Sequence, residues 1–260
     1  MLIRSLGFRT DVALLERGGS HVVRREGYWR IASPHNPTHY WGNFLLLDEP
    51  GDVVQSEALF HRELPHALHV AIGIDATEVV DDDLRPFRDA GFEVSGATVL
   101  VATALAVVEA PRGVVVRAFN SPDDWQQSVA LSMATREEKY EADGFLVYLR
   151  AKALTQQRLC AAGHGAWCGA FIDGALVAQM GLVDCGEGRA RFQTVETHPE
   201  YRRRGLATVT LSALGTYARR ELQPQQFVIV ADPAYFAIDL YRSLGFEVRE
   251  NQWQLQRLPA

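Results

Sequence analysis

Apolar and polar residues alternate along residues 189–197, and the spacing of the apolar residues becomes helical after Gly205. Alternation with a period of two is typical of a strand. It would place one set of residues on each side of that strand: Phe192, Thr194 and Glu196 on the first, and Gln193, Val195 and Thr197 on the second. After a turn at Pro199, small and apolar residues recur three or four positions apart, at Ala207, Leu211, Leu214, Ala218 and Leu222. The pattern predicts a strand, a loop and a helix that begins near Gly205.

Three consecutive arginines, Arg202, Arg203 and Arg204, stand directly before Gly205 in the predicted loop. The first turn of a helix carries backbone N–H groups without helical partners and the positive end of the helix dipole, and a phosphate group satisfies both. A glycine at this place lets the phosphate oxygens approach the backbone, because it has no Cβ atom. The sequence therefore predicts an anion-binding loop at the start of this helix.

The spacing Arg202-x-x-Gly205-x-Ala207 resembles the pyrophosphate loop of the GNAT acyl-CoA N-acyltransferases. A second motif follows the apolar run at residues 227–230. A helical segment that starts at Tyr235 contains Tyr241, four residues before the Gly-Phe pair at residues 245–246, and this ending is similar to the second signature of the family. Both motifs occur in the order and at about the separation that the family requires. Residues 114–258 are therefore identified as a member of the GNAT family.

The resemblance implies an α/β (α+β) fold in which a mixed, mostly antiparallel sheet is flanked by helices. The segments expected in this domain are a strand at 114–119, helices at 124–136 and 139–162, a hairpin of 169–172 and 176–183, and strands at 189–197, 226–231 and 246–258. The Asp-Gly pair at 173–174 favours a tight turn in that hairpin. In this fold the fourth and fifth strands diverge, the pantetheine arm of the cofactor lies between them, and the last strand closes the sheet.

The resemblance implies acetyl-CoA as cosubstrate and no metal. It assigns Val195 and Thr197 to contacts with pantetheine, and it assigns the pyrophosphate to the loop and first helical turn, at Arg202, Arg203, Arg204, Gly205, Leu206, Ala207 and Thr208. The acceptor would be a primary amine on a small molecule, an amino acid or a peptide.

The chemistry of acyl transfer requires two further groups. A protonated amine has to lose a proton before it attacks a thioester, and the leaving thiolate benefits from an acid. Tyr241 stands at the motif position for the acid, and we take Glu196, acting through a water molecule, as the base. Glu200, His198 and Asp232 also stand near the loop and remain alternatives for the base.

Composition indicates an ordinary soluble protein of two domains. The chain has 260 residues, of which 47% are hydrophobic and 22% charged. No apolar run approaches the roughly 20 residues of a membrane span, and the N-terminus lacks the apolar core of a signal peptide, so we expect a cytoplasmic location. The three cysteines form no CxxC pair, which indicates neither a disulfide framework nor a zinc site.

Charge divides unevenly between the two halves of the chain. Residues 1–110 contain 9 Lys+Arg against 16 Asp+Glu, a net charge of −7, whereas residues 111–260 contain 17 against 16, a net charge of +1. The acidic first half argues against nucleic acid as a partner, and a run of three arginines is too short to form a nucleic-acid-binding surface. We expect a monomer or a homodimer, with no membrane partner.

A proline and a glycine near residues 109–113 mark the predicted boundary between two domains, 1–110 and 111–260. Residues 87–94 align with residues 241–248 and are identical at Arg, Gly, Phe, Glu and Val, and a short strand ending in Asp75 or Asp232 precedes each segment. This order favours a duplication, and hence a tandem chain with two GNAT-like domains.

The first half lacks the features assigned to chemistry in the second half. The sequence after its expected strand at 40–47 is acidic and has no Arg-x-x-Gly-x-Ala spacing, and Phe87 stands where the second half has Tyr241. We therefore expect residues 1–110 to form a degenerate, non-catalytic domain that packs against the catalytic one.

Residues 35–43 of the first half are rich in polar aromatic side chains. A metal pair formed by His35 and His39 is disfavoured because Pro37 lies between them and no carboxylate is near in sequence. We predict a turn into a strand, with Trp41 in the core and His39 or Tyr40 facing the acceptor cleft of the other domain.

Two functional classes follow from these residues. The first is an acetyl-CoA-dependent N-acyltransferase that uses direct attack by the amine, with Tyr241 as the acid. The second is a non-catalytic sensor or scaffold that binds acyl-CoA.

Overall fold

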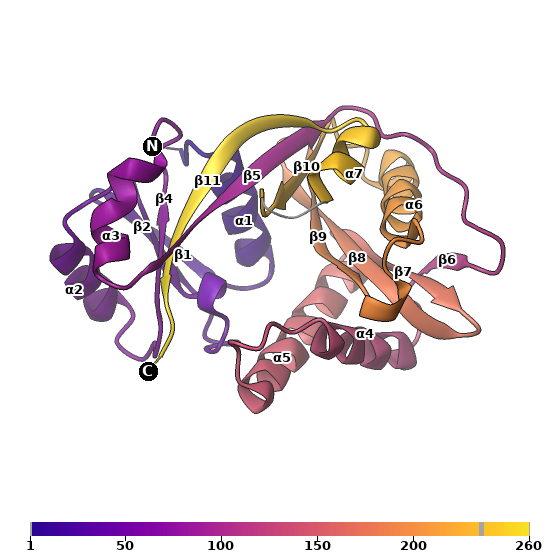
Figure 1. Cartoon of the computed structure of the whole chain (residues 1–260), viewed down its shortest axis with the longest axis horizontal. Helices are drawn as coiled ribbons and strands as arrows, with labels where there is room; N and C mark the ends of the chain where they lie inside the picture. The colour runs from indigo at the N-terminus through magenta and orange to yellow at the C-terminus, as the bar shows by residue number, and fades with distance from the viewer. Residues whose placement is uncertain (1, 234–236, 260) are drawn as a thin grey trace. The chain divides into compact units, whose positions relative to one another are not determined.

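The computed structural model describes residues 2–233 and 237–259 and divides into two compact units. The first unit consists of Met1–Leu100, Val230–Ile238 and Val248–Ala260, and the second consists of Val101–Ile229 and Asp239–Glu247. Each unit is an α/β arrangement with a mixed, mostly antiparallel sheet, as predicted (Figure 1).

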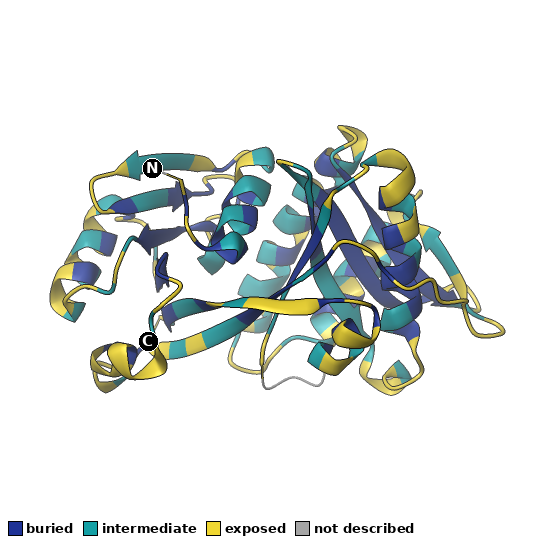
Figure 2. Ribbon diagram, turned by 90° about the horizontal axis from the view of Figure 1, so that it is seen from above, coloured by how far each residue is buried: buried dark blue, intermediate teal, exposed yellow. Residues whose placement is uncertain are grey.

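The sheet of the first unit has the strand order β1, β2, β3, β4, β11, β5. The strands are β1 (His21–Arg25), β2 (Tyr28–Ala32), β3 (Phe44–Leu47), β4 (Val70–Ile74), β5 (Glu93–Ala102) and β11 (Glu247–Arg257). The helices are α1 (Leu6–Arg17), α2 (Val53–Glu63) and α3 (Arg85–Asp89), and two 3-10 turns occur at η1 (Tyr40–Gly42) and η2 (Asp81–Leu84). The core of this unit includes one phenylalanine from each helix, Phe8, Phe60 and Phe87, together with the buried strands β3 and β4. Figure 2 shows the buried segments of the chain in dark blue.

The sheet of the second unit has the strand order β10, β9, β8, β7, β6, in which β10 and β9 are parallel. The strands are β6 (Val115–Ala118), β7 (Gly165–Ile172), β8 (Ala175–Gly186), β9 (Arg189–Thr197) and β10 (Gln226–Ala231). The helices are α4 (Pro122–Ala134), α5 (Ala142–Ala161), α6 (Leu206–Glu221) and α7 (Ala237–Ser243), with a 3-10 turn η3 (Pro199–Tyr201). Figure 1 shows α4 and α5 on one side of this sheet and α6 on the other.

The family resemblance, supported by local sequence patterns, predicted most of the elements of the second unit. The bounds of β9 and β10 match the prediction, and α6 begins one residue after Gly205. The predicted hairpin is formed by β7 and β8, and both Asp173 and Gly174 have positive φ angles, of 50° and 84°. Two consecutive positive φ angles are the conformation of a type I′ turn, which explains the Asp-Gly pair.

Helices α3 and α7 end in the same way, which supports the alignment of the two halves. In α3, the N–H of Phe92 donates to the carbonyl of Phe87, and the N–H of Gly91 donates to that of Arg88. In α7, Phe246 and Gly245 make the equivalent bonds to Tyr241 and Arg242. Both glycines are left-handed, and in each case the two aromatic rings are in contact, as is usual for this helix ending.

The last strand has a different pairing partner from the one predicted. A strand at 246–258 was expected to close the sheet of the second domain, but β11 pairs antiparallel with β4 of the first unit, from Trp253 opposite Ile74 to Arg257 opposite Val70. Its alternation correctly predicted a strand but contains no information about its partner. The compact units are therefore discontinuous in sequence, whereas the division into domains 1–110 and 111–260 remains a prediction.

The segment at 35–43 folds as a loop closed by a polar side chain. The side-chain Oδ1 of Asn43 accepts a hydrogen bond from the N–H of Ser33, and its side-chain Nδ2 donates to the backbone carbonyls of Asn36 and His39. Trp41 is half-buried against the core, as predicted, but the strand starts only at residue 44 because η1 occupies the preceding residues.

Of the three cysteines, Cys168 is buried, and Cys160 and Cys185 are partly buried. Burial raises the pKa of Cys160 to about 11 and that of Cys168 to about 12. Among residues 2–233 and 237–259, no helix is both long and apolar enough to cross a bilayer.

Candidate active site

The arginine loop lies between η3 and α6 and has an unusual backbone. Arg203 and Gly205 both have positive φ angles, of 61° and 73°. Alternation of left-handed residues with ordinary ones turns successive N–H groups toward one side, and such concave arrangements bind anions. Two of the arginine side chains are held to the loop: Arg202 Nε donates to the carbonyl of Thr197 at 3.3 Å, and Arg204 donates to that of Glu200 at 3.2 Å.

The N-terminus of α6 is open. Gly205 is the N-cap residue and supplies no side-chain hydrogen bond, and the first helical bond runs from Val209 N–H to the Gly205 carbonyl at 3.1 Å. The N–H groups of the first turn are therefore not used within the helix. A Cβ atom built on Gly205 would have no atom within 4 Å, so the space beside it is free. This geometry and the helix dipole suit a phosphate group.

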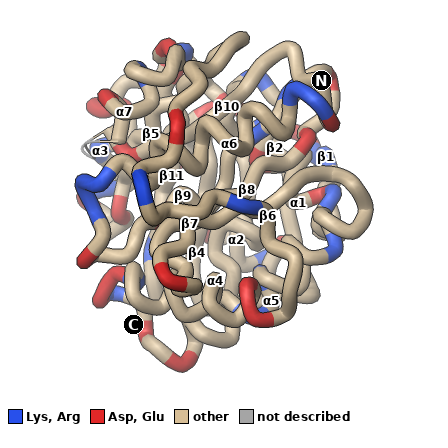
Figure 3. The backbone as a smooth tube through the Cα atoms, turned by 90° about the vertical axis from the view of Figure 1, so that its right-hand side faces the viewer, with Lys and Arg blue, Asp and Glu red and all other residues tan. Residues whose placement is uncertain are grey.

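The structure brings the predicted pyrophosphate residues together around this opening. Arg202, Arg203, Arg204 and Gly205 are exposed, whereas Leu206 anchors the helix by packing against Ala170 and Ala178 of the sheet. Along the backbone trace in Figure 3, basic and acidic residues are interspersed.

Strand β9 contains a bulge beside the predicted pantetheine residues. Its register against β8 changes from Gly181 opposite Gln193 to Gln179 opposite Glu196, so three steps on β9 correspond to two on β8. Thr194, within this extra step, has a φ angle of 53°. A bulge of this kind bends a strand and changes the direction of the side chains that follow it.

The bulge contradicts the simple alternation predicted for this strand. Phe192, Thr194 and Glu196 were expected on one side, but Glu196 is paired with Gln179 and so lies on the same face as Gln193. Phe192, which is paired with Leu182, lies on the opposite face. One inserted residue reverses the pattern, since side chains in a strand alternate with a period of two.

Strands β9 and β10 diverge beyond their first residues, as predicted. Their parallel pairing runs from Gln226 opposite Arg189 to Val228 opposite Arg191, whereas β9 continues to Thr197. Val195 and Thr197 lie in the part of β9 beyond this pairing. An edge of this kind offers backbone N–H and carbonyl groups to an extended ligand.

Glu196 is held by buried polar side chains from α4 and β8. Its Oε2 atom accepts a hydrogen bond from Ser132 Oγ at 2.6 Å and another from Gln179 Nε2 at 2.6 Å. Gln179 is fully buried, and its own Oε1 accepts from Ser128 Oγ at 2.5 Å. The carboxylate is therefore fixed in place. No local pattern in the sequence indicated Gln179 or the two serines around it.

A small cavity adjoins this group and has room for roughly one water molecule. Its lining comes from α4, α5 and the bulge of β9: Ser128, Val129, Ser132, Leu149, Lys152, Ala153, Gln156 and Thr194. Lys152 was not predicted as a site residue, although it is one of only two lysines in the sequence.

Tyr241 lies in α7 with 4% of its surface exposed. Its ring contacts that of Phe246 at 6.1 Å between centroids, and Phe246 in turn contacts Phe192 of β9 at 6.1 Å. Phe192 also packs against Phe227 of β10. Tyr241 thus belongs to an aromatic cluster at the point where the two strands diverge.

The three alternative bases have different surroundings. His198 is the N-cap of η3, and its Nδ1 accepts from the N–H of Glu200 at 3.4 Å. The side chain of Glu200 is exposed, and Asp232 belongs to the first unit. The predicted helix start at Tyr235 lies outside the described residues.

The comparisons with known proteins agree with this geometry. Residues 129–246, which include the loop, β9, β10 and Tyr241, match the family model described as "Acetyltransferase (GNAT) family". The chain carries a GNAT acetyltransferase domain. No curated protein matches the chain by sequence.

Solved structures extend the likeness in fold to nearly the whole chain. A GCN5-related N-acetyltransferase from Kribbella flavida has a TM-score of 0.64 and 16% identity, over 97% of this chain and 96% of that one. A functionally unknown conserved protein from Staphylococcus epidermidis has a TM-score of 0.68 and 13% identity, over 93% and 95%. A tandem GNAT protein from the clavulanic acid biosynthesis pathway has a TM-score of 0.54 and 16% identity, over 90% and 82%. Both units therefore have GNAT-like folds.

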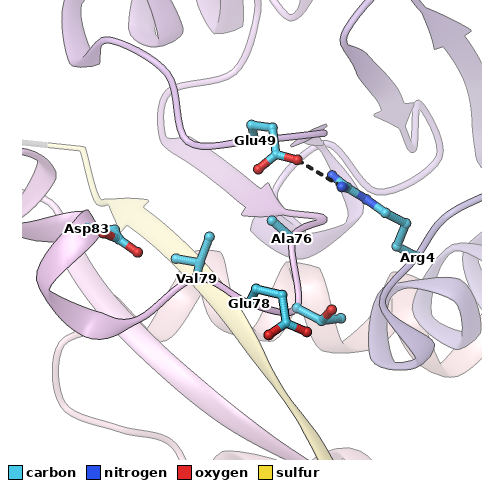
Figure 4. A pocket seen from close by; sticks show the side chains of 7 residues that line it. Arg4, Glu49, Ala76, Glu78, Val79 and Asp83 are labelled. Atoms are coloured by element: carbon cyan, nitrogen blue, oxygen red, sulfur yellow. Dashed lines mark hydrogen bonds and ion pairs between the residues drawn. The ribbon is translucent and has the colours of Figure 1, made fainter.

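The corresponding strand ends of the first unit form an acidic hollow. It has a volume of about 260 Å³, and three carboxylates line it, from Glu49, Glu78 and Asp83 (Figure 4). The single basic side chain, Arg4, is paired with Glu49 at 2.8 Å. Such a hollow repels a pyrophosphate group.

Proposed function

We propose that the C-terminal domain transfers an acetyl group from acetyl-CoA to a primary amine of a small molecule, an amino acid or a peptide. The pyrophosphate would bind at Arg202–Thr208, and the pantetheine arm would extend along Val195 and Thr197. The observation that carries the proposal is the open, arginine-flanked N-terminus of α6 directly beyond the diverging strands β9 and β10. Acetyl-CoA carries a pyrophosphate followed by an extended arm with amide groups. Its binding would therefore use an anion-binding helix start next to a strand edge.

In the proposed reaction, Glu196 takes a proton from the acceptor ammonium through a water molecule. The free amine then attacks the thioester carbon, an amide bond forms and the carbon–sulfur bond breaks. Tyr241 donates its proton to the leaving thiolate and recovers a proton from solvent. The hydrogen bonds that hold the carboxylate of Glu196 in place support its role as the base. The position of Tyr241 in the aromatic cluster where β9 and β10 diverge supports its role as the acid.

The test is a thiol-release assay with acetyl-CoA and a panel of amines: amino acids, polyamines, amino sugars and peptides with free N-termini. We expect release of CoA that depends on one class of amine, together with the acetylated product by mass spectrometry. Saturable binding of acetyl-CoA with no release across the panel would instead favour the second candidate.

The second candidate is a non-catalytic sensor or scaffold that binds acyl-CoA. One observation favours it: Tyr241 is almost completely buried, and its ring makes the helix-ending contact that Phe87 makes in the first unit. A structural function would explain this contact without any proton transfer.

A further inference from the structure

The chain between β5 and β6 passes beside α6 (Figure 1), and we call residues 104–108 of this segment the strap. The strap has no helical or strand structure. All of its residues are exposed except Leu105, which has 7% of its surface in solvent. A segment without regular structure needs other partners to fix its backbone groups. In the strap these partners come from α6 and from the end of α7.

Ser212 of α6 makes two hydrogen bonds to the backbone of the strap. Its Oγ donates to the carbonyl of Ala106 at 3.1 Å and accepts from the N–H of Val108 at 2.8 Å. One hydroxyl thus acts as donor and acceptor at once. Arg219, about two turns further along α6, donates to the carbonyl of Leu105 at 3.3 Å. The strap is therefore attached to α6 at two places.

Gly215 lies between these two attachment points and makes room for Leu105. A Cβ atom built on Gly215 would lie 2.6 Å from Cδ1 of Leu105, so the side chain of Leu105 packs where another residue type would have its own. Glycine in the interior of a helix is unfavourable compared with alanine. The close approach of the strap accounts for a glycine in the middle of α6.

The strap also contacts the end of α7, close to Tyr241. The N–H of Ala106 donates to the carbonyl of Leu244 at 3.1 Å, and the N–H of Leu244 donates to the carbonyl of Tyr241 at 3.0 Å. Three hydrogen bonds in series therefore join the hydroxyl of Ser212 to the backbone of Tyr241. The strap connects the helix that begins at the anion site to the helix that carries the proposed acid.

We propose that Ser212 is a positioning residue for acyl transfer, which acts through the strap to hold Tyr241 in a fixed place relative to the start of α6. This inference rests on the proposed function, in which Tyr241 is the acid. A misplacement of about 1 Å between reacting groups costs up to about a hundredfold in rate. The pyrophosphate would bind at Gly205, about 10 Å from Ser212 along the helix. Loss of the Ser212 hydroxyl should therefore affect turnover and not cofactor affinity.

The first experiment needs no acceptor and measures amide hydrogen exchange. We expect Ser212→Ala to speed exchange in residues 104–108 and 241–246 by about tenfold, because the hydrogen bonds that hold these segments open more often. The matched control is Thr216→Ala, which removes a hydroxyl of the same helix that donates within α6, to the carbonyl of Ser212 at 3.0 Å. This control should leave exchange in both segments unchanged. Unchanged exchange at 241–246 in Ser212→Ala would overturn the proposal.

The second experiment is a double-mutant cycle on acyl transfer. Ser212→Ala should lower kcat by about three- to thirtyfold with the KM for acetyl-CoA nearly unchanged, and Ser212→Thr, which keeps the hydroxyl, should restore kcat. In the Tyr241→Phe background, Ser212→Ala should cause little further loss, because the position of a missing acid no longer matters. An equal loss of kcat in both backgrounds would show that Ser212 does not act through Tyr241 and would contradict the proposal.

The two experiments separate this inference from the proposed function. Full turnover of Tyr241→Phe would show that the proposed acid is wrong, whereas amide exchange would still report whether Ser212 holds the end of α7. If Ser212→Ala does not fold, Ser212→Cys, which has a weaker hydrogen-bonding group of similar shape, replaces it in both experiments.

Discussion

Helices α2 and α6 occupy the same place in the order of elements of the two units, yet their N-termini differ. Helix α2 begins at Asp52, whose carboxylate accepts a hydrogen bond from the N–H of Gln55 at 3.0 Å. Helix α6 begins at Gly205, which has no side chain and leaves the space in front of the helix free. The first helix supplies its own anion, whereas the second leaves its N–H groups for a ligand.

The parallel strand pairs on either side of these helices in the sequence, β3 with β4 and β9 with β10, also differ in how far their pairing extends. The parallel pairing of β3 and β4 continues to the last residue of β3, Leu47, whose carbonyl then accepts from the N–H of Asp75 at 2.7 Å. The pairing of β9 with β10 instead ends six residues before β9 does, at Arg191. The same order of elements thus contains one pair of parallel strands that stay paired to the end of β3, and one pair in which β9 extends six residues beyond its pairing with β10.

The largest expected effect comes from separating the halves. Fragment 111–260 keeps β11 but loses β4, its partner, so the fully buried Leu255 would become exposed. Exposed apolar strands associate, and we expect aggregation or poor activity, measured by size-exclusion chromatography and thiol release. Fragment 101–260 likewise keeps β11 without β4. Fragment 101–247 ends at the first residue of β11, and we expect it to be more soluble than fragment 101–260. A soluble, monomeric fragment 111–260 with full acyl transfer would show that the first half is an independent module.

The next largest effect is expected from Gly205→Glu, which should abolish binding of acetyl-CoA. The substitution places a carboxylate where the phosphate is expected, and it adds about 1 kcal/mol of strain because the φ angle is 73°. Calorimetry should show one site per chain in the native protein and none in the variant. The matched change at the start of α2, Gly51→Glu, should leave binding unchanged. Two binding sites, or binding that survives Gly205→Glu, would refute the assignment of the loop.

Tyr241 and Phe87 provide a smaller and more specific test. Tyr241→Phe gives the second half the residue of the first, and we expect turnover to fall about ten- to a thousandfold with acetyl-CoA affinity nearly unchanged, as for loss of a proton donor. Steady-state kinetics and calorimetry measure the two quantities. Tyr217→Phe, on α6, is the control. Unaltered turnover would mean that Tyr241 acts only in packing.

The smallest effect concerns Asp75, which anchors the N-terminal segment by accepting hydrogen bonds from the N–H groups of Arg4 and Ser5. Burial raises the pKa of Asp75, so its contribution to stability is fully present below the unfolded pKa of about 3.9 and is lost as pH rises through the folded value. In urea unfolding, the free energy of unfolding of Asp75→Asn, relative to that of the native protein, should therefore be higher at pH 7 than at pH 4. The opposite trend would show that the charged form is the favoured one.

The sequence by itself determined the local features of this protein. The helical spacing after Gly205 predicted α6, the Asp-Gly pair predicted the turn at Asp173, and the alternation along 189–197 predicted β9. Each of these depends on residues a few positions apart, whose backbone preferences and apolar spacing are visible in the sequence. The motif around Arg202 belongs to this group, since a loop and the helix that it begins are contiguous.

The tertiary structure alone decided the features that depend on distant partners. The bulge at Thr194, which moves Glu196 to the other face of β9, follows from the register against β8 and not from the composition of β9. The partner of β11 and the neighbours of Lys152 were decided in the same way. Period-two patterns do not specify which strand lies alongside, and the position of a residue in a helix does not show which side chains surround it. The loop and the start of α6 were therefore predictable from sequence, whereas the environment of the proposed base was not.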